Sequence, residues 1–356
     1  MAGNCQYVNP QPGEWVKGKL IGAGSFGSVH LAMNKTTGGL FVVKSAQSGA
    51  GFKALKNEAD ILQSLNSSPY VVQFLGTDNS AADNFNFFME YMAGGSLADV
   101  AEKFGGSLDE EVVRLYTKEI LQGLKFLHEH GIVHCDVKSN NVLLGLSGNI
   151  KLADFGSAKR VKDLMGKSGV ENSWQSIGGT PLWMAPEVLR NEGLFFAADI
   201  WSLGCTIIEM ATGRPPWGDD VSNPMAAILK IALSDEMPQF PTKFSKEGLD
   251  FLAKCLQRDP ERRWTADNLL SHPFISCNSS ITSEKEVIGS PASVLEFGVF
   301  EDGYDSNESE SPNEIHVPIR NPLSRCSGDS KGAARCWEHE GSEIWSSENW
   351  ITVRSG

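Results

Sequence analysis

The fold of this 356-residue chain is decided by two short stretches, His134-Cys135-Asp136-Val137-Lys138-Ser139-Asn140-Asn141 and Asp154-Phe155-Gly156. The first stretch offers a carboxylate at Asp136, an ammonium group at Lys138 and an amide oxygen at Asn141. These groups suit an acceptor hydroxyl, a transferring phosphoryl group and a metal ion, respectively. Asp154 supplies a second carboxylate, so Asn141 and Asp154 together offer the oxygen ligands that magnesium with bound phosphates needs.

A glycine-rich segment lies upstream of these stretches and runs Ile21-Gly22-Ala23-Gly24-Ser25-Phe26-Gly27-Ser28-Val29. Glycines let the backbone approach phosphates and present amide donors with no Cβ in the way. Alone the pattern is weak, because an ordinary turn or a dinucleotide-binding fold has similar glycines. The dinucleotide version opens a helix and has an acidic residue about 20 positions later. Here residues 29–33 continue as a strand and residues 44–50 contain no acidic residue, which argues against that version.

Lys44 stands at the end of the next expected strand, residues 40–45, where an ammonium group can hold two phosphates as a point charge. Residues 51–65 are predicted to form a helix, because apolar residues recur at spacings of three and four at Phe52, Leu55, Ala59 and Leu62. Glu58 lies on that helix and is expected to pair with Lys44. Taken singly, Lys44 and Glu58 could each equally be an ordinary solvent-exposed residue.

A second helix is predicted just before the stretch that begins at His134. Ser107-Leu108-Asp109-Glu110 fits a capping box at its start. An apolar stripe follows on one face, made of Val113, Tyr116, Ile120, Leu124 and Leu127. Gly131 sits where this helix is expected to stop.

Composition divides the chain into a flexible lead (residues 1–14), a folded region (residues 15–274) and an acidic tail (residues 275–356). Strand patterns dominate the folded region up to residue 92, and helical patterns dominate residues 93–274, which indicates an α+β fold. The tail holds 14 Asp and Glu against 6 Lys and Arg, a net charge of −8 out of −13 for the whole chain. Because it lacks sustained apolar periodicity, the tail is expected to be mostly disordered.

The composition also excludes several classes of protein. The acidic balance argues against nucleic acid as a partner. No apolar run approaches the roughly 18 residues of a membrane span, so no membrane partner is expected. The start of the chain carries no secretory signal pattern. The 7 cysteines are odd in number and form no zinc-type pair, which favours reduced thiols in a cytoplasmic or nuclear protein.

The motifs together resemble those of eukaryotic protein kinases over about residues 15–274. Further motifs follow in that family's order: Ala185-Pro186-Glu187, Asp199-Ile200-Trp201-Ser202-Leu203-Gly204 and Arg263. The resemblance implies a two-lobed fold, with a small β-rich N-lobe (residues 15–92), a larger helical C-lobe (residues 93–274) and ATP between them. It also implies that Glu187 pairs with Arg263 and that Asp199 supports the catalytic loop.

The subfamily can be narrowed from the same motifs. Lys138 and the run Gly179-Thr180-Pro181 resemble serine/threonine kinases more than tyrosine kinases. The run from Gly179 to Val188, together with the short lead and the acidic tail, resembles the plant MEKK-like MAP kinase kinase kinases. This implies a MAP kinase kinase as the protein substrate, in a signalling cascade for plant stress or hormones.

The resemblance implies roles for the nucleotide-binding residues. The backbone from Ile21 to Val29 covers ATP. Lys44 orients the α- and β-phosphates and Glu58 anchors Lys44. Glu90 and Met92 belong to the hinge beside the adenine, and Met89 guards the back of the pocket.

The catalytic and metal-binding roles follow in the same way. Asp136 accepts or orients the proton of the substrate hydroxyl, and Lys138 steadies the γ-phosphate. Asn141 and Asp154 bind Mg²⁺. Catalysis then consists mainly of positioning and charge neutralisation.

Two positions depart from the family pattern. Val42 stands where Ala is usual over the adenine ring, which predicts a slightly tighter pocket. Cys135 stands where many kinases have an arginine that grips a phosphate on the activation loop, here on Ser168, Ser173, Ser176 or Thr180. We therefore expect weaker dependence on activation-loop phosphorylation. Cys135 is interpreted as a small space-filling residue, with a redox-active thiol as the alternative.

Two questions stay open at this stage. The first is whether the chain is an active kinase, a pseudokinase scaffold that binds cascade partners without catalysis, or a serine/threonine kinase of another group. The presence of every catalytic residue favours the first. The second concerns the tail, whose Trp337, Trp345 and Trp350 suit a segment that docks an upstream kinase or regulator, with an incidental tail as the alternative.

Overall fold

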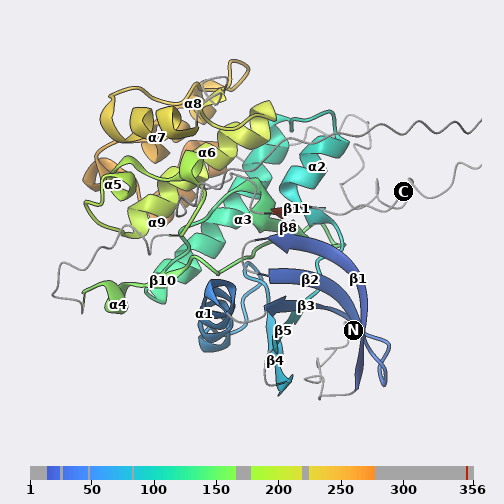
Figure 1. Ribbon diagram of the computed structural model, residues 1–356. Coiled ribbons are helices and arrows are strands. Elements are labelled where there is room, and N and C mark those ends of the chain that lie inside the picture. The colour runs from blue at the N-terminus through green and yellow to red at the C-terminus, as the bar shows by residue number, and fades with distance from the viewer. Residues whose placement is uncertain are drawn as a thin grey trace, which may run out of the picture.

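The computed structural model describes residues 14–24, 27–46, 49–81, 84–165, 178–218, 224–276 and 350–351. The chain forms two stacked parts (Figure 1): a twisted β-sheet with one helix, drawn in blue, and a larger helical part, drawn from cyan to orange. This is the two-lobed α+β arrangement that the sequence predicted.

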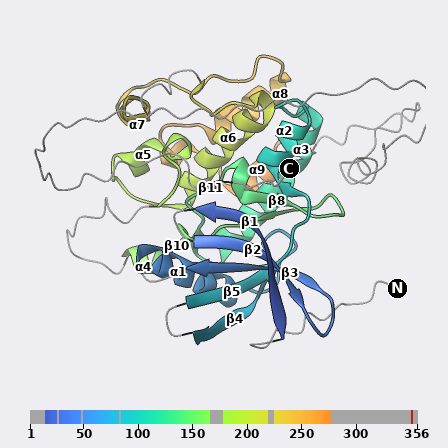
Figure 2. The ribbon, with the colours of Figure 1, turned by 45° about the vertical axis from the view of Figure 1, so that its right-hand side comes forward.

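The sheet of the N-lobe consists of antiparallel neighbours in the order β11-β1-β2-β3-β5-β4. Its main strands are β1 (Trp15–Gly24), β2 (Gly27–Asn34), β3 (Leu40–Ala46), β4 (Phe74–Ala81) and β5 (Asn84–Glu90). One helix, α1 (Ala50–Ser64), packs against β3, β4 and β5 and lies beside α4 in Figure 2. Of the four apolar residues predicted for one face of this helix, Leu55, Ala59 and Leu62 are buried and Phe52 is partly buried.

Strand β3 decides where Lys44 points. Successive side chains of a strand face opposite sides of a sheet. Phe41 and Val43 face one side, where they pack in a small apolar cluster with Phe88. Val42 joins the main core on the other side. Lys44 has the same parity as Val42 and therefore emerges on the side of α1 and the cleft.

Helices build the C-lobe around α6 (Phe196–Thr212), most of whose residues are buried. The other helices are α2 (Leu97–Lys103), α3 (Glu110–Glu129), α4 (Val161–Met165), α5 (Pro186–Leu189), α7 (Pro224–Leu233), α8 (Lys246–Cys255), α9 (Ala266–Leu270) and α10 (Pro273–Ser276). Helix α3 lies against α6 and α9, and α6 against α8. The predicted apolar stripe of α3 is buried, and Gly131 adopts a φ of 68° just past its end.

The C-lobe also contains short pieces of structure between its helices. They are β6 (Gly95–Ser96), β7 (Ile132–Val133), η1 (Ser139–Asn141), β8 (Val142–Leu144), β9 (Ile150–Leu152), β10 (Lys159–Arg160), η3 (Pro181–Trp183) and η5 (Pro260–Arg262). The catalytic stretches predicted from the sequence fall on the loops beside these pieces.

The predicted capping box at the start of α3 is wrong. The helix begins at Glu110 with Asp109 as its N-cap, and no side chain caps it. The Glu110 carboxylate instead accepts hydrogen bonds from the backbone N–H (2.9 Å) and the hydroxyl (2.5 Å) of Ser245. A tertiary contact has therefore replaced the local one. A capping box does occur one helix earlier, between Ser96 and Asp99 at the start of α2.

One main hydrophobic cluster runs through both lobes, from Leu55 of α1 to Leu124 of α3 and Trp201 of α6. The lobes therefore share a core below the cleft, which fixes the distance between residues contributed by each. Within the described ranges, no helix is both long and apolar enough to cross a bilayer.

The predicted acidic tail is described only at Trp350–Ile351, which form β11. This short strand pairs antiparallel with β1, in the register Ala23 with Ile351 and Gly24 with Trp350. The predicted lead up to residue 13 and the rest of the tail beyond residue 276 lie outside the described residues.

Candidate active site

Three charged side chains from separate elements meet at the back of the cleft. The ammonium group of Lys44 lies 2.7 Å from Glu58 Oε2 and 2.8 Å from Asp154 Oδ1. Lys44 and Glu58 are buried, with 2% and 0% exposure. Strand β3, helix α1 and the loop after β9 thus contribute one charge each. The pair predicted from the sequence, Lys44 with Glu58, is present, and Asp154 joins it.

The cluster holds one positive and two negative groups, and this imbalance appears in the pKa values. Burial opposes charge on Lys44, but the carboxylates of Asp154 and Glu58 outweigh it and raise the Lys44 pKa. Burial raises the pKa of Glu58 to about 7, although Lys44 acts in the opposite direction. For Asp154, the charge of Lys44 outweighs burial and lowers the pKa. Asp154 is therefore the carboxylate that stays ionised, while Glu58 takes up a proton near neutrality.

The segment around Asp154 is fixed from both lobes. The backbone N–H of Phe155 donates to Glu58 Oε1 at 3.2 Å, which ties this segment to α1. Asp154 itself has a φ of 62°, in the left-handed region that non-glycine residues seldom adopt. The Phe155 ring is fully buried and packs on His134, with 4.8 Å between the ring centroids. His134 is thus a buried packing residue, as the sequence predicted.

Asp199 of α6 supports the catalytic loop from below. Its carboxylate accepts hydrogen bonds from the backbone N–H groups of His134 and Cys135, both at 2.9 Å. It also lies 2.9 Å from His128 Nε2. Cys135 has a φ of 69°, a costly conformation, and the hydrogen bonds that the backbone N–H groups of His134 and Cys135 donate to Asp199 stabilise it. This strained backbone aims the next residue, Asp136, toward the cleft.

A hairpin explains why Asn141 and Asp154 converge. Val142 at the start of β8 pairs with Leu152 at the end of β9. The residues just outside this pair, Asn141 and Ala153, are joined by a backbone hydrogen bond of 2.9 Å. Asp154 follows at once, so the two expected metal ligands lie at the same end of one small hairpin.

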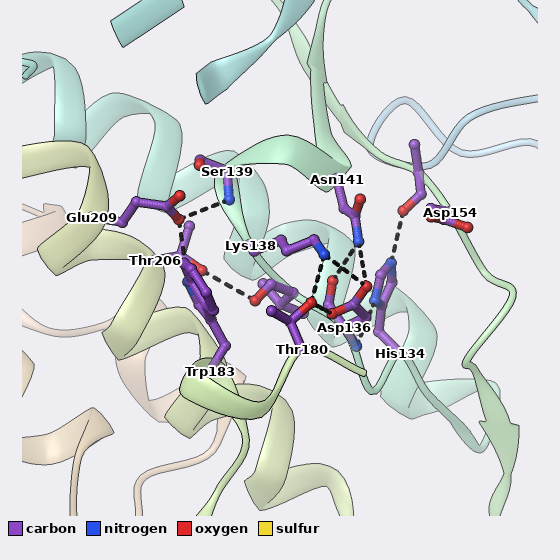
Figure 3. A network of polar contacts seen from close by, with 12 residues as sticks. His134, Asp136, Lys138, Ser139, Asn141, Asp154, Thr180, Trp183, Thr206 and Glu209 are labelled. Carbon is purple, nitrogen blue, oxygen red and sulfur yellow. Dashed lines mark hydrogen bonds and ion pairs between the residues drawn. The ribbon is translucent and has the colours of Figure 1, made fainter. Parts of the chain in front are cut away.

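Asp136 lies at the centre of a polar network (Figure 3). The Asn141 amide nitrogen donates to Asp136 Oδ2 at 2.9 Å, and Lys138 Nζ lies 3.3 Å from the same oxygen. The Thr180 hydroxyl donates to Asp136 Oδ1 at 2.7 Å and accepts from Lys138 Nζ. A threonine hydroxyl therefore already contacts both the carboxylate and the ammonium group of the loop.

The side chain of Thr180 lies in the catalytic network and not in the environment expected for a phosphorylation position. The sequence suggested it as one of four candidate phosphorylation positions on the activation loop. Its side chain is instead buried against Asp136, where an added phosphate would meet that carboxylate at close range. The other three candidates, Ser168, Ser173 and Ser176, lie outside the described residues.

Glu209 was not among the predicted site residues, although it belongs to this network. Glu209 Oε2 accepts from the backbone N–H of Ser139 and from Trp183 Nε1, both at 3.1 Å. Glu209 therefore joins the catalytic loop to η3, the turn just after Thr180 (Figure 3). Burial raises the pKa of its carboxyl group. The available signal was that Glu209 and Asp199, ten residues apart, are the only charged residues of the mainly apolar helix α6.

A cavity of about 480 Å³ lies between the lobes, above this network. The predicted site residues in its lining are Ile21, Gly22, Val29, Lys44, Glu58, Glu90, Met92, Asn141 and Asp154, and Val42 and Met89 line it too. Ala23, Gly24, Gly27 and Ser28 lie in the strands above it but not in its lining, while Ser25 and Phe26 lie outside the described residues. Asp136 and Lys138 adjoin it through Asn141.

Gly27 shows why the segment above this cavity needs a glycine. Its φ is 137°, which L-residues rarely adopt, and a Cβ there would lie 2.1 Å from the carbonyl oxygen of Ser45. The start of β2 therefore approaches β3 more closely than a side chain at position 27 would allow. A glycine at this position thus lets β2 pack closely on β3, the strand that carries Lys44.

Asn141 and Asp154 suit magnesium accompanied by phosphates. Asn141 uses its amide nitrogen toward Asp136, which leaves its amide oxygen as an acceptor. Across the described part of the chain, no three His, Cys, Asp or Glu side chains gather as a dedicated metal cage. Magnesium commonly uses one or two protein oxygens and completes its shell with phosphate and water, so this donor set fits it.

The remaining structural motifs are placed as the resemblance implied. Arg263 forms a bidentate ion pair with Glu187, with N–O distances of 2.7 and 3.0 Å. For Cys135, burial raises the pKa of the thiol well above its ordinary value, and the charge of Asp199 adds to this. Since the thiolate is the reactive form, a raised pKa favours the space-filling interpretation.

Comparison with known proteins agrees with this geometry. The family described as protein kinase domain matches residues 15–275, so the chain belongs to the protein kinase family. Within that family, it is similar to plant MAP kinase kinase kinases.

Three relatives from Arabidopsis thaliana illustrate this similarity. Mitogen-activated protein kinase kinase kinase 3 is 44% identical over 74% of this chain and 41% of its own length. Mitogen-activated protein kinase kinase kinase 17 is 42% identical over 75% of this chain and 71% of its own length. Mitogen-activated protein kinase kinase kinase 20 is 36% identical over 96% of this chain and all of its own length. The chain thus spans about two fifths of the first relative and the full length of the third.

Proposed function

We propose that this chain is an ATP-dependent serine/threonine protein kinase that acts as a MAP kinase kinase kinase, with a MAP kinase kinase as its substrate. The observation that carries the proposal is the convergence of Lys44, Glu58 and Asp154 beside Asp136 and Asn141. The similar proteins are named MAP kinase kinase kinases, and these names indicate the position proposed for this chain in a signalling cascade. Protein kinases use ATP and Mg²⁺, and the cavity and donor set fit both.

The residues of this chain act mainly by positioning. Lys44, held by Glu58, orients the phosphates of ATP. Asn141 and Asp154 would hold Mg²⁺, and the bound ion would supply positive charge beside the phosphates. Asp136 accepts the hydrogen bond of the substrate hydroxyl and aims its oxygen at the γ-phosphate. Lys138 lies beside Asp136 and stabilises negative charge as the phosphoryl group moves. Preorganised charges of this kind account for much of the catalysis in a dry site.

Selectivity for serine and threonine has support within the chain. The hydroxyl of Thr180 donates to Asp136 and accepts from Lys138. A substrate serine or threonine hydroxyl that replaced it would find the same acceptor and the same ammonium group. The rival interpretation, a scaffold without catalysis, is not favoured, because all six catalytic and metal-binding residues are present and contact one another in two linked groups.

A phosphoryl-transfer assay tests the proposal. The full chain is incubated with ATP, Mg²⁺ and a catalytically inactive MAP kinase kinase, and compared with Asp136→Asn and Lys44→Met. We expect phosphate on serine or threonine of the substrate with the wild type and a loss of at least about 100-fold with each variant. Equal incorporation by all three proteins would contradict the proposal.

The acidic tail is proposed to be a regulatory segment that an upstream kinase or regulator engages. Its support is the pairing of β11 with Ala23 and Gly24 of β1, the strand whose Ile21 and Gly22 line the nucleotide cavity. Deletion of residues 350–356 tests this directly. We expect a changed KM for ATP, and an unchanged KM together with unchanged partner binding after truncation at Ile275 would remove the idea.

We also propose that the protein resides in the cytoplasm or nucleus, with neither nucleic acid nor membrane as a partner. The described cysteines Cys135, Cys205 and Cys255 are free thiols, which supports a reducing compartment. A fluorescent fusion of the full chain should therefore fill cytoplasm or nucleus, and a membrane-bounded pattern would contradict this.

A further inference from the structure

Helix α1 is bonded along one side to the segment around β10, and Figures 1 and 2 both show these two elements close together. The guanidinium nitrogen Nη2 of Arg160 donates hydrogen bonds to the carbonyl oxygen of Asp60 and to the hydroxyl of Ser64, both at 2.9 Å. The side-chain amide nitrogen of Asn57 donates to the carbonyl oxygen of Ala158 at 3.0 Å. We call these three hydrogen bonds the α1–β10 clamp.

The clamp lies on the side of α1 opposite its buried apolar face. Asn57, Asp60 and Ser64 are spaced by three and four positions and therefore share one side of the helix. Glu58 follows Asn57 directly and so lies about a quarter of a turn away from it, between the clamp and the apolar face. A rotation or shift of α1 away from the clamp would therefore also move Glu58 relative to Lys44.

Helix α1 has little stabilisation of its own at either end. Its N-cap residue, Gly49, provides no side-chain hydrogen bond, and α1 has no acidic residue in its first turn and no basic residue in its last turn. A cation near the C-terminal end of a helix is favourable, because it offsets the partial negative charge of the last carbonyl groups. Arg160 supplies this cation from another segment, so the position of α1 depends on a tertiary contact.

The backbone of Arg160 is anchored in the C-lobe. Strand β10 pairs antiparallel with β7, with Arg160 opposite Ile132. The backbone N–H of Val161 donates to the carbonyl oxygen of Gly131 at 2.9 Å. Ile132 is buried, and β7 leads directly into the catalytic loop at His134. The clamp therefore connects α1 of the N-lobe to the strand that precedes the catalytic loop.

The charges in the cleft give the clamp a task. Two carboxylates, Glu58 and Asp154, lie beside the single ammonium group of Lys44. Like charges repel each other strongly where water is excluded, so this repulsion favours movement of α1 away from Asp154. The clamp opposes the movement because it binds the same helix to the C-lobe. Arg160 is not among the residues that line the nucleotide cavity, so it would act on the phosphates through Glu58.

We propose that Arg160 is a positioning residue for phosphoryl transfer, which keeps Glu58 in contact with Lys44 by binding the C-terminal half of α1. The proposal rests on the kinase function proposed above. Both bonds of Arg160 come from one nitrogen atom, so the ammonium group of a lysine can make them too, whereas an alanine cannot. Loss of the clamp lowers the fraction of molecules in which Glu58 holds Lys44, and it leaves every group that contacts the nucleotide in place.

The test measures phosphate transfer from ATP to an inactive MAP kinase kinase by variants of the full chain, each checked for folding by circular dichroism. We expect Arg160→Ala to lower kcat/KM for ATP roughly tenfold, because hydrogen bonds from a charged donor are among the stronger ones. Arg160→Lys should stay within about threefold of the wild type, since it keeps the charged donor. Lys162→Ala removes an exposed cation two positions further along, and as the matched control it should stay within about twofold.

A double-mutant cycle separates action through Glu58 from general damage. In the Glu58→Ala background, Arg160→Ala should lower kcat/KM for ATP by less than about a further twofold, because the contact that it supports is already absent. A further tenfold loss in that background, or a wild-type kcat/KM for Arg160→Ala alone, would overturn the proposal. Asn57→Ala removes the other bond of the clamp and gives the same test if Arg160→Ala folds poorly. A wild type that transfers no phosphate would refute the kinase function itself, on which the proposal rests.

Discussion

Two buried ion pairs, Lys44–Glu58 in the cleft and Arg263–Glu187 in the C-lobe, use similar chemistry for different purposes. Arg263 is matched one-to-one with Glu187 in bidentate geometry and also donates to the carbonyl oxygens of Gln257 and Ala197. Lys44 instead faces two carboxylates, with Asp154 as the second, and borders an open cavity.

This difference shows how an ion pair that stabilises the fold can be distinguished from one that serves catalysis. The Arg263 pair is balanced in charge, all three guanidinium nitrogens donate hydrogen bonds, and neither residue lines the cavity, so losing the pair should lower the stability of the fold. The Lys44 cluster carries surplus negative charge, and burial raises the pKa of Glu58 to about 7. Such a site is ready for additional positive charge and for groups that Lys44 can orient, so its loss should be felt in activity.

The largest expected effect comes from removing the Lys44 charge. Lys44→Met should reduce phosphoryl transfer by at least about 100-fold, because the phosphates lose their orienting cation. The folded protein should persist, since Glu58 can take up a proton once its partner is gone. Activity and circular dichroism measured on the same preparation check both parts. Lys53→Met, an exposed lysine of α1, is the matched control and should behave like the wild type.

Breaking the C-lobe pair should give the opposite pattern. Arg263→Ala leaves Glu187 buried without its partner, and we expect the free energy of unfolding to fall by about 3–5 kcal/mol. Activity per folded molecule should change far less than in Lys44→Met. Denaturant unfolding measures the loss, and Arg262→Ala, at the exposed neighbouring position, should cost little. If Arg263→Ala were as stable as the wild type, the structural role of the pair would be refuted.

Glu58 should make the cleft sensitive to pH. Its folded-state pKa is raised to about 7, so the ligand-free folded state binds a proton that the unfolded state has released. The free energy of unfolding should therefore fall as pH rises from about 4.5 to 7, by up to about 3 kcal/mol. Because the pKa of Asp154 is lowered, its titration affects the free energy of unfolding only at pH values below this range. Glu58→Gln should remove the slope, and a slope that survives in this variant would point to another group.

The catalytic activity should change over the same pH range as the stability, but it should rise where the stability falls. Ionised Glu58 anchors Lys44, so kcat/KM for ATP should rise as pH increases through about 7. In Glu58→Gln this rise should disappear. A wild-type profile that stays flat between pH 6 and 8 would disagree with the raised pKa.

The smallest effect concerns the activation loop. Cys135 offers no guanidinium to a phosphate on that loop, so phosphatase treatment should lower activity less than about tenfold. The rate of dephosphorylated protein on a peptide substrate measures this. A protein that is inactive until rephosphorylated would contradict the interpretation of Cys135.

Much of the cleft was predictable because local sequence rules and family motifs pointed the same way. Strand alternation aims Lys44 at α1, and the helical spacing of Leu55 and Ala59 places Glu58 opposite it. The spacing of Asn141 and Asp154 also has a simple cause, since they flank a single hairpin.

The features that were predicted wrongly or not at all depend on contacts between residues that are distant in the sequence. The Glu110 carboxylate binds Ser245, 135 positions away, and so does not complete a local capping box. Glu209 joins Ser139 to Trp183 only once α6 has packed beneath both. Thr180 was predicted as one candidate phosphorylation position, whereas its buried hydroxyl contacts Asp136, 44 positions away. No local pattern contains these partners.

Stabilisation of the protein by ATP with Mg²⁺ tests the convergence of the cleft residues most directly. A ligand at 100 times its Kd stabilises the folded state by about 2.7 kcal/mol, so the Tm of the wild type should rise clearly. The Arg263→Lys variant should have a lower Tm without ligand and should show the same increase in Tm with ATP and Mg²⁺ as the wild type. The Asp154→Asn variant should lose the portion of this increase that depends on Mg²⁺. A wild type whose Tm does not change, or an Asp154→Asn variant that responds to Mg²⁺ as the wild type does, would contradict the assignment of a nucleotide and metal site to this cleft.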